Sequence, residues 1–217
     1  MTGVAAKICG LSTSEAVQSA AAAGARYVGF VFYEPSPRHV SPAQAAGLAS
    51  AASAVEKVAV MVDPDDDLIA DVTAQVGVDL LQLHGSENPR RVATIRRSFG
   101  VPVMKAVRVS AEEDLIKARE WEHAADMLLF DAKPPATTKN ALPGGNALRF
   151  DWDLLRDRTW ACPWMLSGGL TADNVAEAAS VSGARFVDVS SGVESSPGEK
   201  DPALITRFLA AVARIGA

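Results

Sequence analysis

The stretch AAKICGLSTSEA, residues 5–16, passes from a short apolar run into the start of a helix. Residues 4–9 have the length and composition of a buried strand, and residues 14–23 follow as an Ala-rich amphipathic stretch. This order predicts one unit of strand followed by helix. It also places Cys9 at the carboxyl end of its strand, which raises the question of what a thiol does there.

The same unit recurs along the whole chain. Further strands are predicted at residues 27–32, 57–62, 78–83, 101–107, 127–131, 161–166 and 186–189, and further helices at 42–52, 66–75, 89–99, 111–119, 151–156, 172–180 and 202–215. Eight units in 217 residues leave about 27 residues each, which fits a closed (β/α)8 barrel. An open doubly wound sheet often has a G-x-G-x-x-G turn after its first strand, and this chain lacks that turn. We therefore predict an α/β fold, a TIM barrel formed by residues 1–217 as a single domain.

Composition limits the kind of protein. The chain is 48% hydrophobic and 22% charged, as expected of a globular protein with a sizeable core, and it has no apolar run long enough to span a membrane. A net charge of −5 argues against a nucleic-acid surface, which needs clustered Lys and Arg. Cys9 and Cys162 have no metal-ligand spacing and form no disulfide framework. We expect a cytoplasmic protein with reduced thiols and no metal, membrane or nucleic-acid partner, present as a monomer or homodimer.

In a barrel of this type the active site lies at the carboxyl ends of the strands. The segments SGG (167–169) and SSG (190–192) follow the last two predicted strands and offer exposed backbone N–H groups. One Gly-Gly pair alone would indicate a tight turn. Two such turns on consecutive strands favour a phosphate site, as barrels often hold phosphate there. Its residues would be Gly168, Gly169, Ser190, Ser191 and Gly192.

The strand-end blocks together resemble one family. KICGLS, GFVFYEPSPRHVSP, LLQLHGSE, LFDA, FDWDLL, LSGGLTADNV and VDVSSGVESSPGEKD, from residue 7 to about residue 208, are similar to the signature blocks of phosphoribosylanthranilate isomerases. The resemblance implies a cofactor-free barrel that performs an Amadori rearrangement of a phosphosugar in tryptophan biosynthesis. The substrate would be N-(5-phosphoribosyl)anthranilate and the product 1-(2-carboxyphenylamino)-1-deoxyribulose 5-phosphate.

The resemblance also implies the catalytic residues. Ring opening needs a proton on the ring oxygen, and the rearrangement needs a proton removed from sugar C2. By resemblance, Asp131 in LFDA is the general acid and Cys9 in KICG is the general base. A thiol needs activation, for which Lys7, the start of the next helix and the cationic intermediate are all candidates. On pattern alone an isolated cysteine is usually a small buried hydrophobe, and we interpret Cys162 in that way.

Four further residues are candidates for substrate binding. Arg38 in SPRHV would clamp the anthranilate carboxylate with its planar fork, unless it is an ordinary surface arginine. His84 orients the substrate or only fixes its strand end, and Arg108 is similarly ambiguous. Asp188 lies within a strand and therefore needs a partner, which is either a sugar hydroxyl or the acid-base pair.

One loop departs from the family pattern. Before FDW the family commonly has Gly-Thr-Gly or Gly-Ser-Gly, whereas this chain has GGNALRFDW at residues 144–152, with Asn146 and Ala147 in place of the usual small turn residues. The surrounding stretch 133–149 is predicted to cover the barrel mouth, because long loops in compact domains are usually functional or disordered.

Other functions remain open at this point. A related phosphosugar barrel, such as the histidine-pathway isomerase with two aspartates or indole-glycerol-phosphate synthase, would have Asp or Lys at the end of its first strand. This chain has Cys9 there. The alternative that is not an enzyme is a barrel that binds a phosphosugar without converting it.

Overall fold

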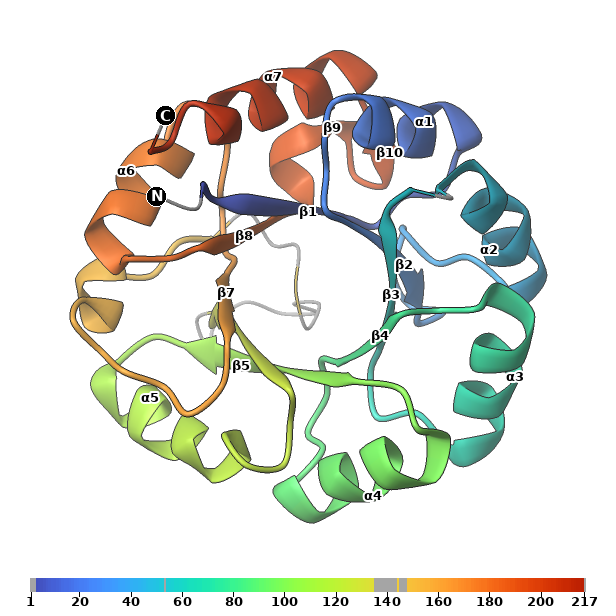
Figure 1. Ribbon diagram of the computed structural model, residues 1–217, viewed down its shortest axis with the longest axis horizontal. Coiled ribbons are helices and arrows are strands. Elements are labelled where there is room, and N and C mark those ends of the chain that lie inside the picture. The colour runs from blue at the N-terminus through green and yellow to red at the C-terminus, as the bar shows by residue number, and fades with distance from the viewer. Residues whose placement is uncertain (1–2, 53, 135–143, 145–147, 217) are drawn as a thin grey trace.

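The sheet of this protein closes on itself. The computed structural model describes residues 3–52, 54–134, 144 and 148–216. In this part of the chain eight parallel strands pair in chain order and the eighth pairs with the first (Figure 1). This arrangement confirms the predicted (β/α)8 barrel. The barrel strands are β1 (Ala5–Cys9), β2 (Tyr27–Phe32), β3 (Glu56–Met61), β4 (Leu80–Leu83), β5 (Val103–Val109), β6 (Met127–Ala132), β7 (Trp164–Leu166) and β8 (Phe186–Val189).

Helices form a ring outside the barrel (Figure 1). They are α1 (Ser14–Ala22), α2 (Pro42–Ala49), α3 (Asp66–Val76), α4 (Pro89–Phe99), α5 (Glu112–Ala118), α6 (Val175–Ser182) and α7 (Pro202–Ala213), with 3-10 turns η1 (Ser50–Ala52), η2 (Arg119–Trp121), η3 (Trp152–Leu155) and η4 (Ser191–Val193). The helix predicted at 151–156 is therefore only the turn η3. Local signals start several of the others, such as the Ser41 capping box before Pro42 and the Asp201 cap before Pro202.

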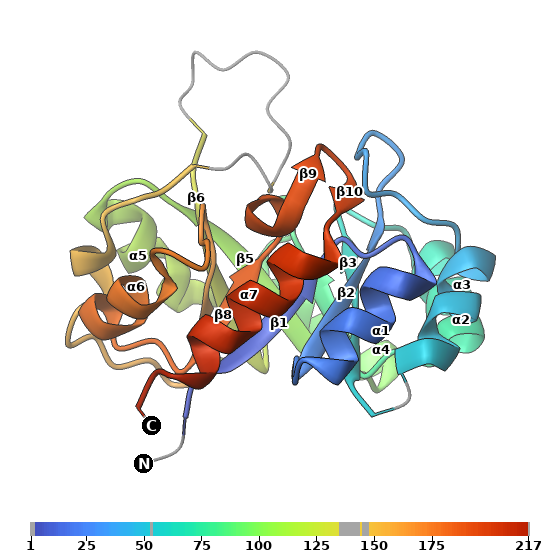
Figure 2. The same cartoon turned by 90° about the horizontal axis from the view of Figure 1, so that it is seen from above.

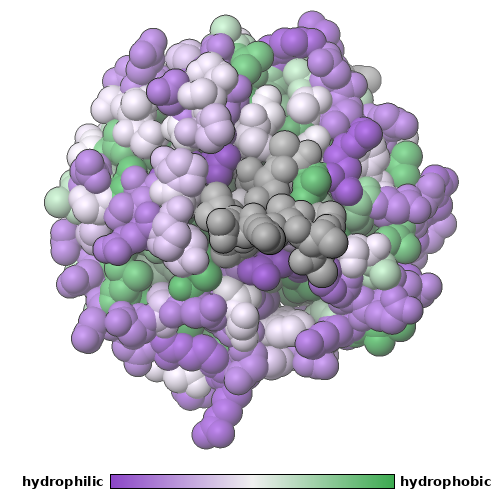
Figure 3. Space-filling view, turned by 180° about the vertical axis from the view of Figure 1, so that it is seen from behind, coloured by the Kyte–Doolittle hydropathy of each residue, from purple (hydrophilic) through white to green (hydrophobic). Residues whose placement is uncertain are grey.

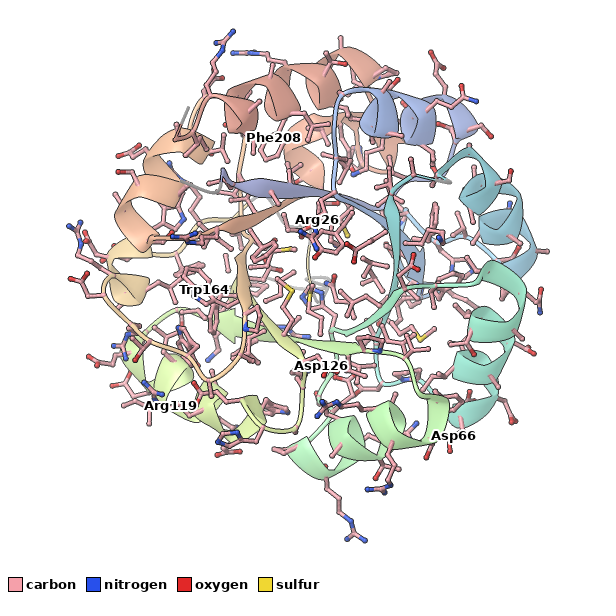
Figure 4. All side chains as sticks on the ribbon, viewed as in Figure 1. Arg26, Asp66, Arg119, Asp126, Trp164 and Phe208 are labelled. Atoms are coloured by element: carbon pink, nitrogen blue, oxygen red, sulfur yellow. The ribbon has the colours of Figure 1, made fainter. Side chains whose placement is uncertain are left out.

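The strand period of two divides the apolar residues into two layers. Ile8, Phe30 and Phe130 belong to the larger core cluster, between the barrel and its helices. Figure 4 shows Phe208 of α7 on that side of the barrel wall. A second cluster fills the inside of the barrel: Cys9, Tyr27, Val31, Val58, Val60, Leu80, Met104, Ala106, Met127, Leu129 and Met165. Cys9 is therefore an inward residue, as its strand-end position predicts.

Prolines explain two shifted strand boundaries. β5 and β7 begin at Val103 and Trp164, each directly after a proline, rather than at residues 101 and 161. Proline has no N–H to donate to a sheet ladder, so each ladder starts beyond it. The other end of β5 extends past the predicted residue 107, and Arg108 pairs in register with Asp131 of β6.

The two ends of the barrel differ. Both termini lie at one end, while a short hairpin of β9 (Glu194–Ser196) and β10 (Glu199–Lys200) stands at the other (Figure 2). The hairpin is unexpected, because no period-two pattern marks it. The predicted cover at 133–149 falls mostly outside the described residues, as do Asn146 and Ala147. No helix in the described part of the chain has the length and apolar character to cross a membrane.

Candidate active site

The carboxyl ends of the strands surround one cavity of about 790 Å³, measured with its open mouth. Figure 3 views the molecule from behind Figure 1, at the end where these strands finish, and apolar residues occur there only in small separate spots. Nearly all the predicted site residues line this cavity: Cys9, Arg38, His84, Asp131, Gly168, Gly169, Asp188, Ser190, Ser191 and Gly192. Arg108 is the exception. Its guanidinium donates to the backbone carbonyl of His84 at 3.2 Å, so it supports the end of β4.

The thiol of Cys9 is buried beside two ammonium groups. Only 7% of Cys9 is exposed, and burial raises the pKa of its thiol, whereas the positive charges of Lys7 and Lys200 act to lower it. The helix start is a poor source of activation, because α1 begins only at Ser14, beyond the loop that follows Cys9. Of the activators within the protein, Lys7 has the largest effect on the thiol.

A buried ion pair holds Lys7 in place. Its ammonium donates to Asp188 Oδ1 at 2.9 Å, and the other carboxylate oxygen accepts from the Ser167 hydroxyl at 3.0 Å. Burial alone would lower the pKa of Lys7, but the Asp188 carboxylate raises it, so the ammonium stays charged. Asp188 thus has its partner inside the protein. Because Lys7 pairs with Asp188 in register between β1 and β8, the barrel closure itself creates this contact.

A glycine leaves room for the contact between Lys7 and Cys9. Gly29 lies opposite Cys9 on the adjacent strand β2. A Cβ at Gly29 would stand 3.2 Å from Cys9 Sγ and 3.2 Å from Lys7 Nζ. The missing side chain at this position therefore lets the ammonium approach the sulfur.

Asp131 lies at the end of β6, and its neighbour is a histidine. Oδ1 accepts from the backbone N–H of Ala132 at 3.0 Å, and Oδ2 is 3.4 Å from His84 Nε2. Gln82 lies on β4, two residues before His84, and approaches the other ring nitrogen, with 3.1 Å between Gln82 Nε2 and His84 Nδ1. All three side chains are buried and line the cavity.

Arg38 is held by a carboxylate of the unexpected hairpin. Its Nε and Nη2 donate to the two oxygens of Glu194 at 2.7 and 2.8 Å. Lys200 donates to Glu194 Oε1 at 2.6 Å and also to the carbonyl and hydroxyl oxygens of Ser190 at 2.9 and 3.2 Å. Arg38 is thus a buried cavity residue rather than an ordinary surface arginine, and one edge of its fork is used by Glu194.

The two predicted phosphate loops pack directly on neighbouring backbone. Gly168 and Gly169 have φ of 89° and 60°, which favours glycine. A Cβ on Gly192 would stand 2.0 Å from the carbonyl oxygen of Leu170. Small residues are therefore required for the loops after β7 and β8 to meet at the cavity.

Four residues that the sequence analysis did not single out complete the site: Gln82, Ser167, Glu194 and Lys200. Gln82 could have been found from its period-two spacing to His84, since a polar residue at an inward position of a strand needs a partner. Glu194 and Lys200 could not, because the hairpin brings them to the site. Among the residues that the structure describes, no group of three His, Cys, Asp or Glu side chains is arranged to hold a metal ion.

Comparison with known proteins agrees with this geometry. Residues 6–211 match the family model of N-(5'-phosphoribosyl)anthranilate (PRA) isomerase. The N-(5'-phosphoribosyl)anthranilate isomerase of Rhodospirillum centenum is 56% identical over 210 residues, covering 96% of this chain and 98% of that protein. The relative from Caulobacter is 51% identical and covers 98% of this chain and 100% of that protein.

Solved structures give the same result. The isomerase from Thermotoga maritima superposes with a TM-score of 0.85 at 36% identity, covering 97% of this chain and 98% of that one. A structure of phosphoribosyl anthranilate isomerase in complex with reduced 1-(o-carboxyphenylamino)-1-deoxyribulose 5-phosphate has a TM-score of 0.83 at 34% identity, with the same coverage. The family match over nearly the whole chain confirms the resemblance seen in the strand-end blocks. This chain belongs to the N-(5'-phosphoribosyl)anthranilate isomerase family.

Proposed function

We propose that this chain converts N-(5'-phosphoribosyl)anthranilate to 1-(2-carboxyphenylamino)-1-deoxyribulose 5-phosphate in tryptophan biosynthesis, with Asp131 as general acid and Cys9 as general base. The observation that carries the residue assignment is that these two side chains, from β6 and β1, line one cavity. Family membership supports the reaction.

In the proposed steps Asp131 gives up one proton and Cys9 takes up one proton. Asp131 protonates the ribose ring oxygen, the C1–O bond breaks, and the nitrogen lone pair forms the C1=N bond of an iminium ion. The Cys9 thiolate then removes the C2 proton, and the electrons of that bond give the neutral enolamine. Transfer of the hydroxyl proton at C2 to C1 yields the ketone. Asp131 finishes deprotonated and Cys9 protonated, so proton exchange resets both groups.

Burial of Cys9 affects when its thiolate forms during the reaction. Because burial raises the pKa of Cys9, the thiol form predominates at neutral pH in the free enzyme. The fixed charge of Lys7 offsets part of this effect. The cationic iminium next to the sulfur would supply further stabilisation of the thiolate at the step that needs it.

Substrate binding is divided among the ends of the strands. We place the phosphate at the loops that hold Gly168, Gly169, Ser190, Ser191 and Gly192. The anthranilate carboxylate would contact Arg38, whose orientation Glu194 fixes through two hydrogen bonds. Since Asp188 is bound to Lys7 and Ser167, we assign it to tuning of the acid-base pair rather than to a sugar hydroxyl.

The proposal is tested with purified protein and freshly made substrate, by following the loss of anthranilate fluorescence. We expect turnover by the wild type and a fall of roughly 10²-fold or more for Asp131→Asn, the usual scale for a general acid. Asp71→Asn on the exposed face of α3 is the matched control and should leave turnover unchanged. A wild-type protein that binds product but leaves the fluorescence constant would instead identify a binding barrel without activity.

A further inference from the structure

Two polar atoms at the carboxyl end of β4 are buried without a hydrogen-bond partner among the described residues. They are Gln82 Oε1 and His84 Nε2. Both side chains line the cavity, and they are only 1% and 8% exposed. Unpaired polar atoms in a buried site are rare and indicate a functional constraint. Because both side chains line the cavity, a role in the site is the explanation that fits the pair.

The ring of His84 lies between Gln82, which is next to Nδ1, and Asp131, which is next to Nε2. On one side, Gln82 Nε2 approaches Nδ1 at 3.1 Å. With the amide nitrogen of Gln82 facing Nδ1, the amide N–H donates and Nδ1 accepts, which leaves the proton of a neutral ring on Nε2. On the other side, Nε2 is 3.4 Å from Asp131 Oδ2. A proton on Nε2 thus lies next to the carboxyl group that we assign as general acid.

We propose that Gln82 is a positioning residue that fixes the tautomer of His84 with its proton on Nε2, so that His84 donates to the Asp131 carboxylate formed when the ring oxygen is protonated. The proposal rests on the proposed function of Asp131. The distance of 3.4 Å is long for a hydrogen bond, and such contacts commonly tighten only in the complex with substrate. In this arrangement His84 Nε2 acquires its missing partner during the reaction.

The backbone around the ring supports a fixed orientation. Arg108 Nη2 donates to the carbonyl oxygen of His84 at 3.2 Å, and the N–H of His84 donates to the carbonyl of Met61 at 2.8 Å. Both groups hold the main chain at the end of β4, but neither contacts the ring nitrogens. Within the described residues, Gln82 alone is placed to choose the tautomer through Nδ1.

The tautomer can be read directly by ¹⁵N NMR of the histidine rings. The chain has three histidines, and His39 and His123 are exposed, so the buried ring of His84 should be distinguishable. In the wild type at neutral pH we expect the proton on Nε2. A wild-type ring with its proton on Nδ1 would overturn the proposal without any mutation.

Two variants of Gln82 then test the link to turnover. Gln82→Met keeps the length of the side chain but removes the donor, and we expect loss of the fixed tautomer with a kcat at least about tenfold lower and little change in KM. Gln82→Glu offers only acceptor oxygens and should place a proton on Nδ1, a change that the ring ¹⁵N signals report. Gln75→Met on the exposed face of α3 is the control and should change neither the ring signals nor kcat.

The outcomes separate the two proposals. If Gln82→Met leaves both the ring signals and kcat unchanged, the positioning role is wrong. If the tautomer depends on Gln82 but Asp131→Asn retains full turnover, the assignment of Asp131 as the acid fails, whereas the role of Gln82 in fixing the ring stands.

Discussion

Cys9 combines a position suited to catalysis with an environment that opposes its ionisation. The sulfur lines the cavity, yet burial raises the pKa of the thiol. Thiolate is the nucleophilic form, so the alkylation rate reports its population. We predict that the rate of Cys9 alkylation by iodoacetamide rises continuously from pH 7 to pH 9 without reaching a plateau, because burial raises the pKa of this thiol above its ordinary value of 9.0.

Peptide mass spectrometry measures this rate separately at Cys9 and at Cys162, the other free cysteine, where burial raises the pKa to about 11. A plateau in the Cys9 alkylation rate below pH 8 would show that the thiolate is already formed at neutral pH. It would contradict the proposal that the cationic iminium is needed to stabilise the thiolate. Lys7→Met should slow the reaction of Cys9 at each pH, because the positive charge that most lowers the pKa of the thiol is lost.

At the scale of single residues, the sequence predicts positions better than partners. Cys9, Asp131 and the phosphate-loop residues were predicted from strand ends and family blocks, and the structure brings them to one cavity. Their roles stay predictions until tested. The partners were missed: Glu194 lies far from Arg38 in the sequence, and a contact at such separation leaves no local pattern.

The strand β2 carries a prediction of its own. A side chain at Gly29 would enter the space that Lys7 and Cys9 share, at 3.2 Å from both Nζ and Sγ. For Gly29→Ala we expect a kcat about tenfold lower, since a misplacement of about 1 Å at a reacting group can cost roughly 100-fold. Crowding in the barrel interior should also lower the free energy of unfolding by about 1–3 kcal/mol.

Gly47→Ala is the matched control for this variant. Gly47 lies in α2, where an added Cβ meets no atom within 4 Å. Alanine is the better helix former by about 1 kcal/mol, so this variant should keep wild-type kcat and unfold at a slightly higher temperature. Equal kcat values for the two variants would contradict the view that Gly29 makes room for the ammonium.

Among the elements, periodicity predicted each barrel strand, while boundaries depended on individual residues. Pro102 and Pro163 delay the starts of β5 and β7. The hairpin of β9 and β10 was missed because its polar, partly exposed residues carry no alternation. This element supplies Glu194 and Lys200, so the least predictable part of the fold holds part of the site.

For the whole molecule, the buried charges around Glu194 couple stability to pH. Burial alone would raise the pKa of this carboxyl, but the hydrogen bonds from Arg38 and the charge of Lys200 lower it from 4.5 to about 2. The folded protein therefore holds this proton less tightly than the unfolded chain does. The stabilisation is complete above about pH 4.5 and is lost as the pH falls toward 2.

Urea unfolding at a series of pH values measures this dependence. We expect Glu194→Gln to unfold at lower urea concentration than the wild type at pH 7, and the difference between the two proteins to shrink as the pH falls below 4.5. Glu199→Gln, at an exposed position of the same hairpin, should follow the wild type throughout. A constant difference between Glu194→Gln and wild type across this range would show that the ion cluster does not cause the effect.

The most direct test of the whole account is turnover by Cys9→Ala, compared with Cys162→Ala in the anthranilate fluorescence assay. Cys162 is a partly buried residue that packs against the outer core, so its replacement should leave kcat near the wild-type value. We predict that Cys9→Ala remains folded and loses roughly 10²-fold or more in kcat. A Cys9→Ala protein that turns over substrate at the wild-type rate would contradict the role of this thiol as the base.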